Sequence, residues 1–370
     1  MRKTYLDNIR FGTVILVLVY HVFYIFNGVG VGGGIQGAPN IPALDTFSYF
    51  VYPWFMVLLF LIAGIGARYS LQSRSGKQFL RERVTKLLVP STLGLFVIHW
   101  VTGYLNIKIG GGLPYIPPFL VYPISVISGI GPLWFIQALF LFSLLLVLVR
   151  KLDSKDTFWN LCGKANIPVL LLLVFPIWGA AQVLNMPLLT MYRFGIYGLA
   201  FFLGYFVFSH DAVQDSLEKI RIPMLTVAIA LGVFYVYHYF GENYTSAQCL
   251  QSLLTNVYLW VAVLAVLGCG KAWLNRETRI SDYMTKISFG IYILHYPVVL
   301  AACWVLYTYC GLPPILNYIL ALAAELILTP VLYELFKRIP VLRYFVLGIK
   351  KKTPGQPKAA LPAPDLAAAH

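Results

Sequence analysis

Residues 7–23 read DNIRFGTVILVLVYHVF, and this stretch decides the fold class. Beyond its first few residues it is almost wholly apolar, which is typical of a helix that crosses a membrane. Arg10 stands at its start, and His21 lies well inside it. An ionisable side chain inside the bilayer is costly, about 2.5–3.5 kcal/mol for an arginine at the helix centre on insertion scales. These two residues therefore need an explanation from the rest of the chain.

The whole chain shares this apolar character. Its 370 residues are 59% hydrophobic and only 11% charged, whereas a soluble domain is about 25% charged. The composition predicts an all-α, polytopic integral membrane protein embedded in a lipid bilayer. The five cysteines show no CxxC or zinc-type spacing, so we expect neither a metal site nor a disulfide framework.

Ten apolar segments are long enough to be membrane spans. They cover about residues 11–28, 47–67, 87–105, 132–150, 167–184, 194–209, 222–240, 250–269, 287–307 and 315–335. The proline-rich stretch 113–131 is also apolar, and as a re-entrant or interfacial piece it could change this count by one. We expect residues 1–352 to form a single domain and residues 353–370 to be a disordered tail rich in Pro and Ala.

The cations fall on one side of this predicted topology. With the N-terminus in the cytoplasm, 26 of the 28 Lys and Arg residues lie in inner segments, and only Lys108 and Arg193 lie in outer ones. This asymmetry follows the positive-inside rule and predicts that both termini are cytoplasmic. Topology therefore explains the net charge of +14 without a nucleic-acid partner. We interpret Arg193 as a solvated loop residue near the outer face, with contact to a polar acceptor as the alternative.

Helical geometry relates Arg10 to His21. At about 100° and 1.5 Å per residue, a separation of 11 residues ends about 20° beyond three full turns, with a rise of about 16 Å. The two side chains should share one face, with Arg10 at the cytoplasmic boundary and His21 near the bilayer midplane. Read separately, Arg10 is an interfacial anchor and His21 a packing residue. Read together, they are an ionisable pair that faces a cavity.

Three further ionisable residues fall inside predicted spans. His295 precedes Pro297 by two residues, and this proline should loosen the helix. Glu325 lies in the middle of the tenth span and should be neutral or paired. His99 lies near the outer end of the third span. For each of them a packing role and a functional role both remain open.

A basic stretch precedes the third span. Residues 67–90 read ARYSLQSRSGKQFLRERVTKLLVP and hold six cations between Arg68 and Lys86. Topology alone would account for them. The functional alternative is a clamp for the pyrophosphate and 3′-phosphate of a cytoplasmic ligand, because Arg forks and Lys point charges suit phosphate. The closely spaced Arg81, Arg83 and Lys86 are the best candidates.

Six segments, taken in order, resemble the acyltransferase 3 family of membrane O-acyltransferases over residues 5–348. They are YLDNIRFGTVILVLVYH (5–21), FLIAGIGARYSL (60–71), FLRERVTKLLVP (79–90), GPLWFIQALFLFSLL (131–145), ISFGIYILHYPVVL (287–300) and YELFKRIPVLRYFVLG (333–348). Ala63 departs from the serine that is common in this family. The spacing of Asp7, His21, the Arg81 stretch and His99 also resembles, more weakly, the osmoregulated-glucan succinyltransferase branch.

The resemblance implies a transferase that uses acyl-CoA and acylates a hydroxyl of a cell-surface glycan or another carbohydrate-like acceptor. Acetyl is the commonest acyl group in the family, and succinyl is an alternative. The enzyme would lie in the plasma or inner membrane, and it would require no metal. The resemblance also implies that Arg10 and His21 are the essential pair, and that basic residues on the inner side hold the CoA.

These implications assign roles to the polar residues. His21 would act as general base, or alternatively as the site of a covalent acyl group. The expected CoA contacts are Arg10, Arg68, Arg81, Arg83 and Lys86. The expected acceptor-side residues are His295, Tyr292, His99, Glu325 and Trp134, with Glu325 also able to orient a histidine. The competing interpretation is an exporter of a polysaccharide or small molecule that uses midplane His and Glu as a proton relay.

Overall fold

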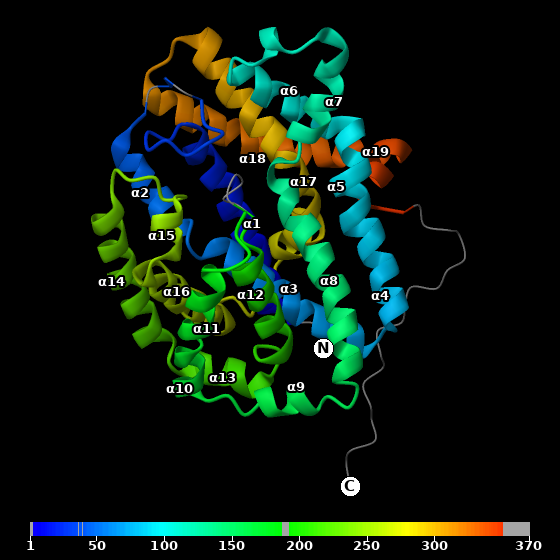
Figure 1. The fold of residues 1–370 in the computed structure, drawn as a ribbon, viewed down its shortest axis with the longest axis vertical. Helices are drawn as coiled ribbons and strands as arrows, with labels where there is room; N and C mark the ends of the chain where they lie inside the picture. The colour runs from blue at the N-terminus through cyan, green and yellow to red at the C-terminus, as the bar shows by residue number, and fades with distance from the viewer. Residues whose placement is uncertain (1–2, 36, 39, 187–191, 351–370) are drawn as a thin grey trace.

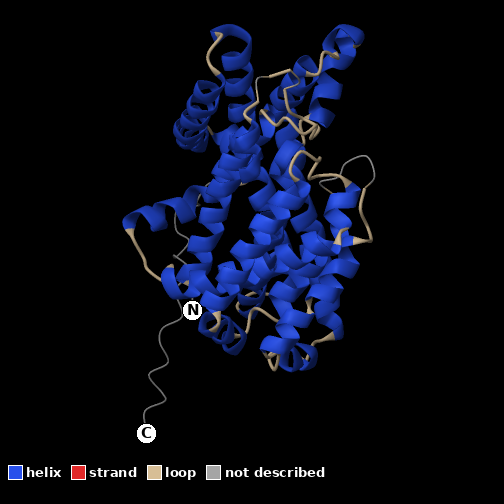
Figure 2. Ribbon diagram, turned by 90° about the vertical axis from the view of Figure 1, so that its left-hand side faces the viewer, coloured by secondary structure: helices blue, strands red, loops and turns tan. Residues whose placement is uncertain are grey.

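The chain folds into a bundle of helices, as expected for an all-α membrane protein (Figure 1). The computed structural model describes residues 3–35, 37–38, 40–186 and 192–350, and the predicted tail 353–370 lies outside this range. Within these ranges there is no strand, only an isolated β-bridge between Asn185 and Arg193. Figure 2 accordingly shows helices joined by loops.

The helices follow one another through nineteen α-helical segments and five 3₁₀- or π-helical ones. Their bounds are α1 Thr4–Ile25, α2 Pro42–Val51, α3 Phe55–Gln72, α4 Gly76–Arg83, η1 Val84–Leu88, α5 Val89–Gly94, η2 Leu95–His99, α6 Trp100–Ile109, η3 Leu113–Tyr115, α7 Pro118–Ser128, η4 Gly131–Leu133, α8 Trp134–Leu152, α9 Thr157–Cys162, α10 Ile167–Leu172, α11 Val174–Ala181, α12 Phe194–Phe206, α13 Asp211–Lys219, α14 Arg221–Tyr239, α15 Ala247–Gln251, α16 Leu253–Trp273, α17 Arg279–Val305, η5 Leu306–Cys310, α18 Pro314–Arg338 and α19 Pro340–Phe345.

The expected count of ten spans is not confirmed. Eight helices in the described part of the chain are long and apolar enough to cross a membrane, or nine if one bent pair is a single span. The bent pair is α12 and α13, which meet at 105°, and α12 alone has only 13 residues. The fifth expected span is present as the shorter apolar helix Ile167–Ala181. The sequence predicted full spans for these segments because hydropathy measures apolar character. It does not detect where a helix turns.

The third span is interrupted by two π-helical segments. η1 and η2 flank α5, which contains Pro90. Proline has no N–H to donate within a helix and crowds the preceding turn, so the backbone there must depart from regular α-helical bonding. Short π-helical segments are frequent at functional sites. This irregular segment lies directly beside the cavity described below.

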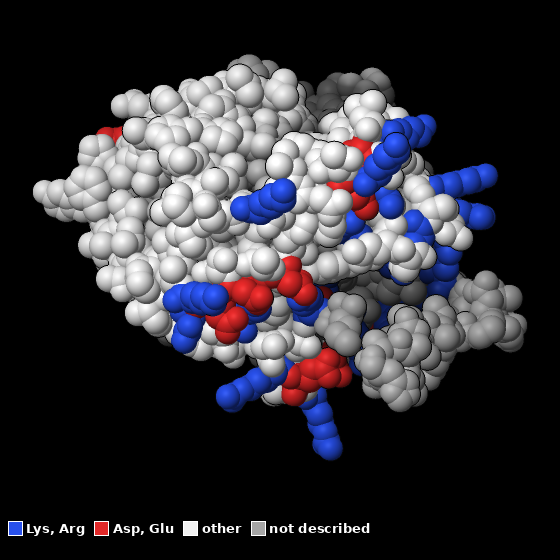
Figure 3. All heavy atoms as spheres, turned by 90° about the horizontal axis from the view of Figure 1, so that it is seen from below, with Lys and Arg blue, Asp and Glu red and all other residues white. Residues whose placement is uncertain are grey.

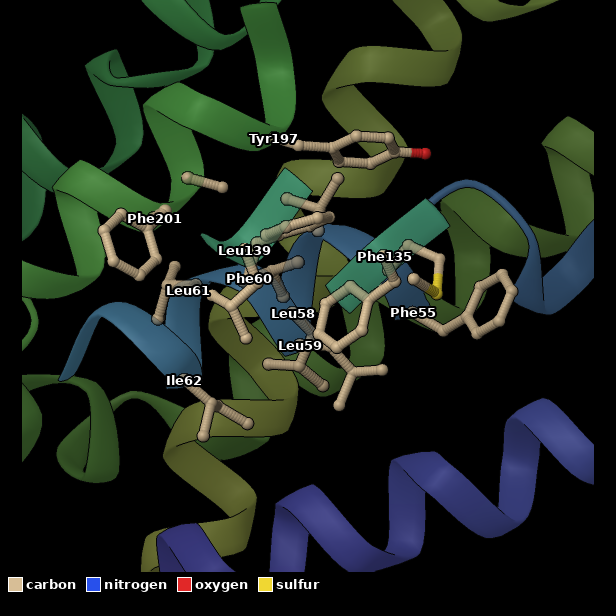
Figure 4. Packing of buried hydrophobic residues seen from close by; sticks show 14 of the residues in the cluster. Phe55, Leu58, Leu59, Phe60, Leu61, Ile62, Phe135, Leu139, Tyr197 and Phe201 are labelled. Atoms are coloured by element: carbon tan, nitrogen blue, oxygen red, sulfur yellow. The ribbon is translucent and has the colours of Figure 1, made fainter. Parts of the chain in front are cut away.

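A core of apolar side chains surrounds α3, which is buried along most of its length. The Phe60 ring packs against Phe135 at 4.6 Å and Tyr197 at 4.8 Å between ring centroids. Figure 4 shows these rings with the neighbouring leucines of α3 and with Phe201 of α12. Because lipid is as apolar as these side chains, close van der Waals packing rather than water exclusion must hold such helices together.

Two glycines allow α3 and α12 to approach closely. A Cβ atom at Gly64 would lie 1.9 Å from the Phe201 carbonyl oxygen, and one at Gly204 would lie 2.0 Å from the Leu61 carbonyl oxygen. Only glycine fits at either position, because a methyl group would meet rigid backbone. Small residues at helix crossings are typical of membrane bundles.

We therefore expect Gly64→Ala to destabilise the protein. The methyl group must push α3 away from α12, and overpacking of this kind costs about 1–3 kcal/mol. The matched control is Gly66→Ala on the same helix, because a Cβ atom at Gly66 meets nothing within 4 Å. Thermal unfolding in detergent should give a lower midpoint for Gly64→Ala alone, and equal midpoints for the two variants would contradict this account of the crossing.

Positive charge gathers at the end of the bundle that is lowest in Figure 1. Seen from below, Lys and Arg side chains lie along this end, with a smaller number of acidic side chains among them (Figure 3). This distribution is the one that the positive-inside rule predicts for a cytoplasmic face.

Candidate active site

Two histidines from distant parts of the chain meet in the helix core. His21 comes from α1 and His295 from α17, and these two helices pack against each other. The His21 Nδ1 atom lies 3.2 Å from His295 Nε2, and the ring centroids are 4.9 Å apart. His295 is fully buried, whereas His21 is half-buried. The structure thus pairs two residues that the sequence analysis considered separately.

The backbone partners of these rings determine which nitrogen carries the proton. His295 Nδ1 lies 2.6 Å from the Tyr292 carbonyl oxygen, and His21 Nδ1 lies 2.8 Å from the Val17 carbonyl oxygen. A carbonyl can only accept, so each Nδ1 must carry a hydrogen. In the neutral pair, His295 Nε2 is then an acceptor that shares the His21 Nδ1 hydrogen. No described residue hydrogen-bonds to His21 Nε2, so its lone pair is available, as a general base requires.

Aromatic side chains surround His21. The rings of Tyr20, Tyr24 and Tyr296 have centroids 5.3, 5.7 and 5.2 Å from the imidazole. In the described part of the chain, no acidic side chain hydrogen-bonds to either histidine. The pair is therefore held by main-chain carbonyls and by the neighbouring imidazole, and it has no carboxylate of the kind found in a Ser-His-Asp triad.

A cavity of about 820 Å³ opens at the cationic end of α1. Its basic lining residues are Arg10, Arg74, Arg81, Arg83, Lys86, Lys286 and Lys350. Glu82 is the single acidic residue among the described lining residues, and it pairs with Arg74 at 3.2 Å. Such an excess of positive charge attracts an anionic ligand with several charges. We call this space the cationic cavity.

Four of the five predicted phosphate-binding residues line the cationic cavity: Arg10, Arg81, Arg83 and Lys86. Arg10 is also paired with Asp7 at 2.8 Å, which holds its guanidinium at the end of α1. Arg74, which belongs to the basic stretch before the third span, lines the same cavity, and so do Lys286 and Lys350, which were counted in the sequence only as topological charges. No local pattern could have selected them, because α17 and the segment after α19 reach the cavity only through tertiary packing.

Arg68 does not lie with this group, so the structure does not support its predicted role. Its side chain is 5% exposed and makes two hydrogen bonds to Asp156, at 2.7 and 3.0 Å. Its guanidinium also stacks 3.9 Å above the Trp159 ring. The Arg68 guanidinium lowers the pKa of the Asp156 carboxyl group through these hydrogen bonds. Arg68 therefore fixes the α8–α9 connection instead of facing the cavity.

The inner end of the cationic cavity is apolar and reaches toward the histidine pair. Its walls there include Val14, Leu59, Phe135 and Leu139, together with Tyr292. The Tyr292 ring centroid lies 5.5 Å from that of His295, and its hydroxyl donates to the Pro132 carbonyl at 2.7 Å. Tyr292 thus stands between the cavity and the histidine pair. A ligand with a charged head and an apolar arm would fit this gradient from cationic mouth to apolar end.

His99 is more deeply placed than an interfacial role would suggest. It ends η2, is only 2% exposed, and its Nε2 atom has no hydrogen-bond partner among the described residues. It is close enough to His295 to interact with it electrostatically. His99 therefore belongs to the surroundings of the histidine pair and not to the outer surface.

Glu325 and Trp134 occupy buried positions near the site. Glu325 is fully buried in α18, and neither of its carboxyl oxygens has a partner in the part of the chain that the structure describes. It lies near Cys303 of α17. Trp134 packs its ring 5.2 Å from Tyr197 and 6.1 Å from Phe60. Their proposed contacts with an acceptor remain predictions.

Arg193 differs most from its expected place. It was interpreted as a solvated loop residue, but it is 3% exposed. It directly precedes α12, and its backbone forms the isolated bridge with Asn185. One feature of the sequence could have indicated this burial. Arg193 directly precedes an apolar segment, and the packing of a helix can bury a cation at its start.

Among the described residues, no group of three or more His, Cys, Asp or Glu side chains could hold a metal ion. A family model described as an acyltransferase domain matches residues 3–334. No curated protein and no solved structure shows a significant match to the chain.

Proposed function

Because this chain belongs to the acyltransferase family whose domain covers residues 3–334, we propose that it moves an acyl group from acyl-CoA to a hydroxyl group, with His21 as general base. The family establishes a multi-pass membrane acyltransferase. The observation that carries the proposal is the His21–His295 pair, which leaves His21 Nε2 without a partner among the described residues and packs against Tyr292 in the wall of the cationic cavity. Family membership also favours transfer over the export function that the sequence alone left open.

The cationic cavity suits the CoA part of the donor. The phosphates would lie at its mouth against Arg10, Arg81, Arg83 and Lys86, where Arg forks and a Lys ammonium can make charge-assisted hydrogen bonds. The pantetheine arm would follow the apolar walls toward Tyr292. Extended covalent geometry gives this arm a length of roughly 15–20 Å, and Arg10 and His21 are separated by a rise of about 16 Å along α1.

The chemistry then needs only groups that the chain and its substrates supply. His21 Nε2 takes the proton of the acceptor hydroxyl, and the oxygen attacks the thioester carbonyl carbon. The carbon–sulfur bond breaks as the tetrahedral intermediate collapses, and the thiolate leaves with the proton as the CoA thiol. The His295 lone pair stabilises the imidazolium that forms on His21. A covalent acyl group on His21 Nε2 is the alternative route.

The membrane arrangement follows from charge. We propose that the cationic end faces the cytoplasm, where acyl-CoA is present, and that the protein lies in the plasma or inner membrane with both termini inside. The acceptor, a glycan or another carbohydrate-like hydroxyl compound, would reach His21 from the other side. Acetyl-CoA is the donor that we would test first, and succinyl-CoA the second.

The test of this function uses the purified full-length protein in detergent. It is incubated with acetyl-CoA or succinyl-CoA and with methyl β-D-glucoside as a neutral hydroxyl acceptor, and the release of CoA thiol is followed with a thiol reagent. We expect thioester consumption above the rate without protein, and mass spectrometry should find the acylated product or the free acid. Absence of both thioester consumption and CoA binding would contradict the proposal.

A further inference from the structure

Arg193 carries a buried positive charge that the described protein does not neutralise. Its Nη2 atom donates to the Leu250 carbonyl oxygen at 3.1 Å, and its guanidinium also lies close to the Tyr197 hydroxyl. No Asp or Glu among the described residues forms an ion pair with it. The side chain is nevertheless 97% buried, since its exposed fraction is 3%.

A buried guanidinium without a counter-charge is unusual. Taking an ion out of water costs several kcal/mol unless an opposite charge and further hydrogen bonds compensate for it. The same protein shows the usual solution at Arg68, which is buried to a similar degree and makes two hydrogen bonds to Asp156. Within the described ranges, Arg193 has only neutral partners. The missing negative charge is therefore expected to come from a ligand.

The position of Arg193 connects it to the candidate active site by two routes. On one side it lies within electrostatic range of Tyr52, whose ring centroid is 5.7 Å from that of Tyr20, and the Tyr20 ring centroid is 5.3 Å from that of His21. On the other side it lies close to Tyr197, which is within electrostatic range of Tyr292 beside His295. Arg193 therefore lies near the same group of tyrosines that surrounds the histidine pair.

Arg193 also lies at the opposite end of the site from the cationic cavity. α3 and α12 run in the same direction: Arg68 near the end of α3 hydrogen-bonds to Tyr205 near the end of α12. Tyr52 and Arg193 stand just before the starts of the same two helices. The cavity and Arg193 therefore approach the histidines from different sides, so that two different ligands can meet between them.

We propose that Arg193 binds a carboxylate or phosphate group of the acceptor, so that the hydroxyl compound acylated by this enzyme is an anion. This inference rests on the proposed function, because it names the class of the second substrate for the same site. A guanidinium binds a carboxylate or a phosphate through two parallel hydrogen bonds, which fixes orientation as well as affinity. The anchored acceptor would then present its hydroxyl to His21 Nε2.

Binding of chosen probes tests this without any acyl donor. The purified full-length protein is titrated by calorimetry with D-glucuronate, D-glucose 6-phosphate and neutral methyl β-D-glucoside, and with acetate and phosphate as the bare anions. We expect at least one anionic sugar to bind about tenfold more tightly than the neutral glucoside, because a charged hydrogen bond contributes about 1.5–3 kcal/mol. The carboxylate and phosphate arms identify which anion the site prefers.

Variants then show whether the anion binds at Arg193. Arg193→Gln should lose the preference for the anionic sugars, and Arg193→Lys should retain part of it because the charge remains. Lys108→Gln, which removes the other cation predicted on the outer side, should bind the probes as the wild type does. CoA binding and the thermal midpoint of each variant report whether it is folded, and Arg193→Lys keeps the test valid if Arg193→Gln does not fold.

Two results would overturn the proposal: equal binding of anionic and neutral probes by the wild type, including no binding of any anion, or anion binding that survives in Arg193→Gln. Because no acyl-CoA is present, these results are independent of the thioester assay. A protein that binds glucuronate through Arg193 but neither binds CoA nor consumes thioester would contradict the proposed function, and only the anion site at Arg193 would then stand.

Discussion

Replacing His21 by alanine is expected to lower the rate of acyl transfer by about 10²–10⁴-fold, the usual contribution of a positioned general base. His21 Nε2 makes no hydrogen bond with the described residues, and Tyr292 in the wall of the cationic cavity packs against its partner His295. The measurement is CoA thiol release with acetyl-CoA, under the conditions used for the wild type. CoA affinity should be unchanged, because His21 does not line the cavity.

Variants of His295 show whether this residue orients the His21 ring or only fills space in the core. Gln at this position offers an amide oxygen that can accept the His21 Nδ1 hydrogen, whereas Leu offers none. We expect His295→Gln to retain more activity than His295→Leu, although both fill a similar volume. If His21→Ala transfers as fast as the wild type, or if the Leu and Gln variants of His295 are equally active, the histidine pair is not the catalytic device proposed here.

Replacing Arg83 and Lys86 together by alanine should weaken CoA binding by about 100-fold. Each of these cations can make a charge-assisted hydrogen bond to phosphate worth about 1.5–3 kcal/mol, and each 1.4 kcal/mol is a factor of ten in the dissociation constant. Arg83 is held in place by its contact with the Phe79 ring at 4.7 Å, so its guanidinium is already oriented at the cavity. Isothermal titration with CoA measures the effect.

The control for this prediction removes the same charge elsewhere. Lys151 and Lys155 lie at the exposed end of α8 and in the turn after it, and neither lines the cationic cavity. Their double alanine variant should bind CoA as the wild type does. The difference in CoA affinity between the two double variants should also shrink at high salt, because salt screens the attraction between exposed charges. Equal CoA affinity of the two double variants would show that Arg83 and Lys86 serve only the membrane topology.

Part of the site was accessible from the sequence because it depends on local patterns. Arg10 and His21 lie on one continuous helix, so their spacing alone placed them on one face. Arg81, Arg83 and Lys86 lie within six residues of one another, so their charge density was visible as a cluster. All four cations line the cationic cavity in the structure.

Other parts were not accessible because they join residues that are far apart in the chain. His21 and His295 are separated by 274 residues, and no local pattern predicts their hydrogen bond. Arg68 looked equivalent to the other cations of its stretch until its two hydrogen bonds to Asp156 placed it elsewhere. Arg193 looked like an outer loop residue, and only the packing around α12 buries it.

The sequence by itself determined that this is an all-α membrane protein, where most of its apolar helices lie and which end is cationic. These properties follow from hydropathy and charge summed over neighbouring residues. The tertiary structure alone decided that two of the ten segments are short or bent, that His21 pairs with His295, and that Arg193 is buried with no acidic partner among the described residues. The physical reason is that a helix face becomes a binding site only when other helices pack against it, and that packing depends on contacts such as the Gly64–Phe201 approach.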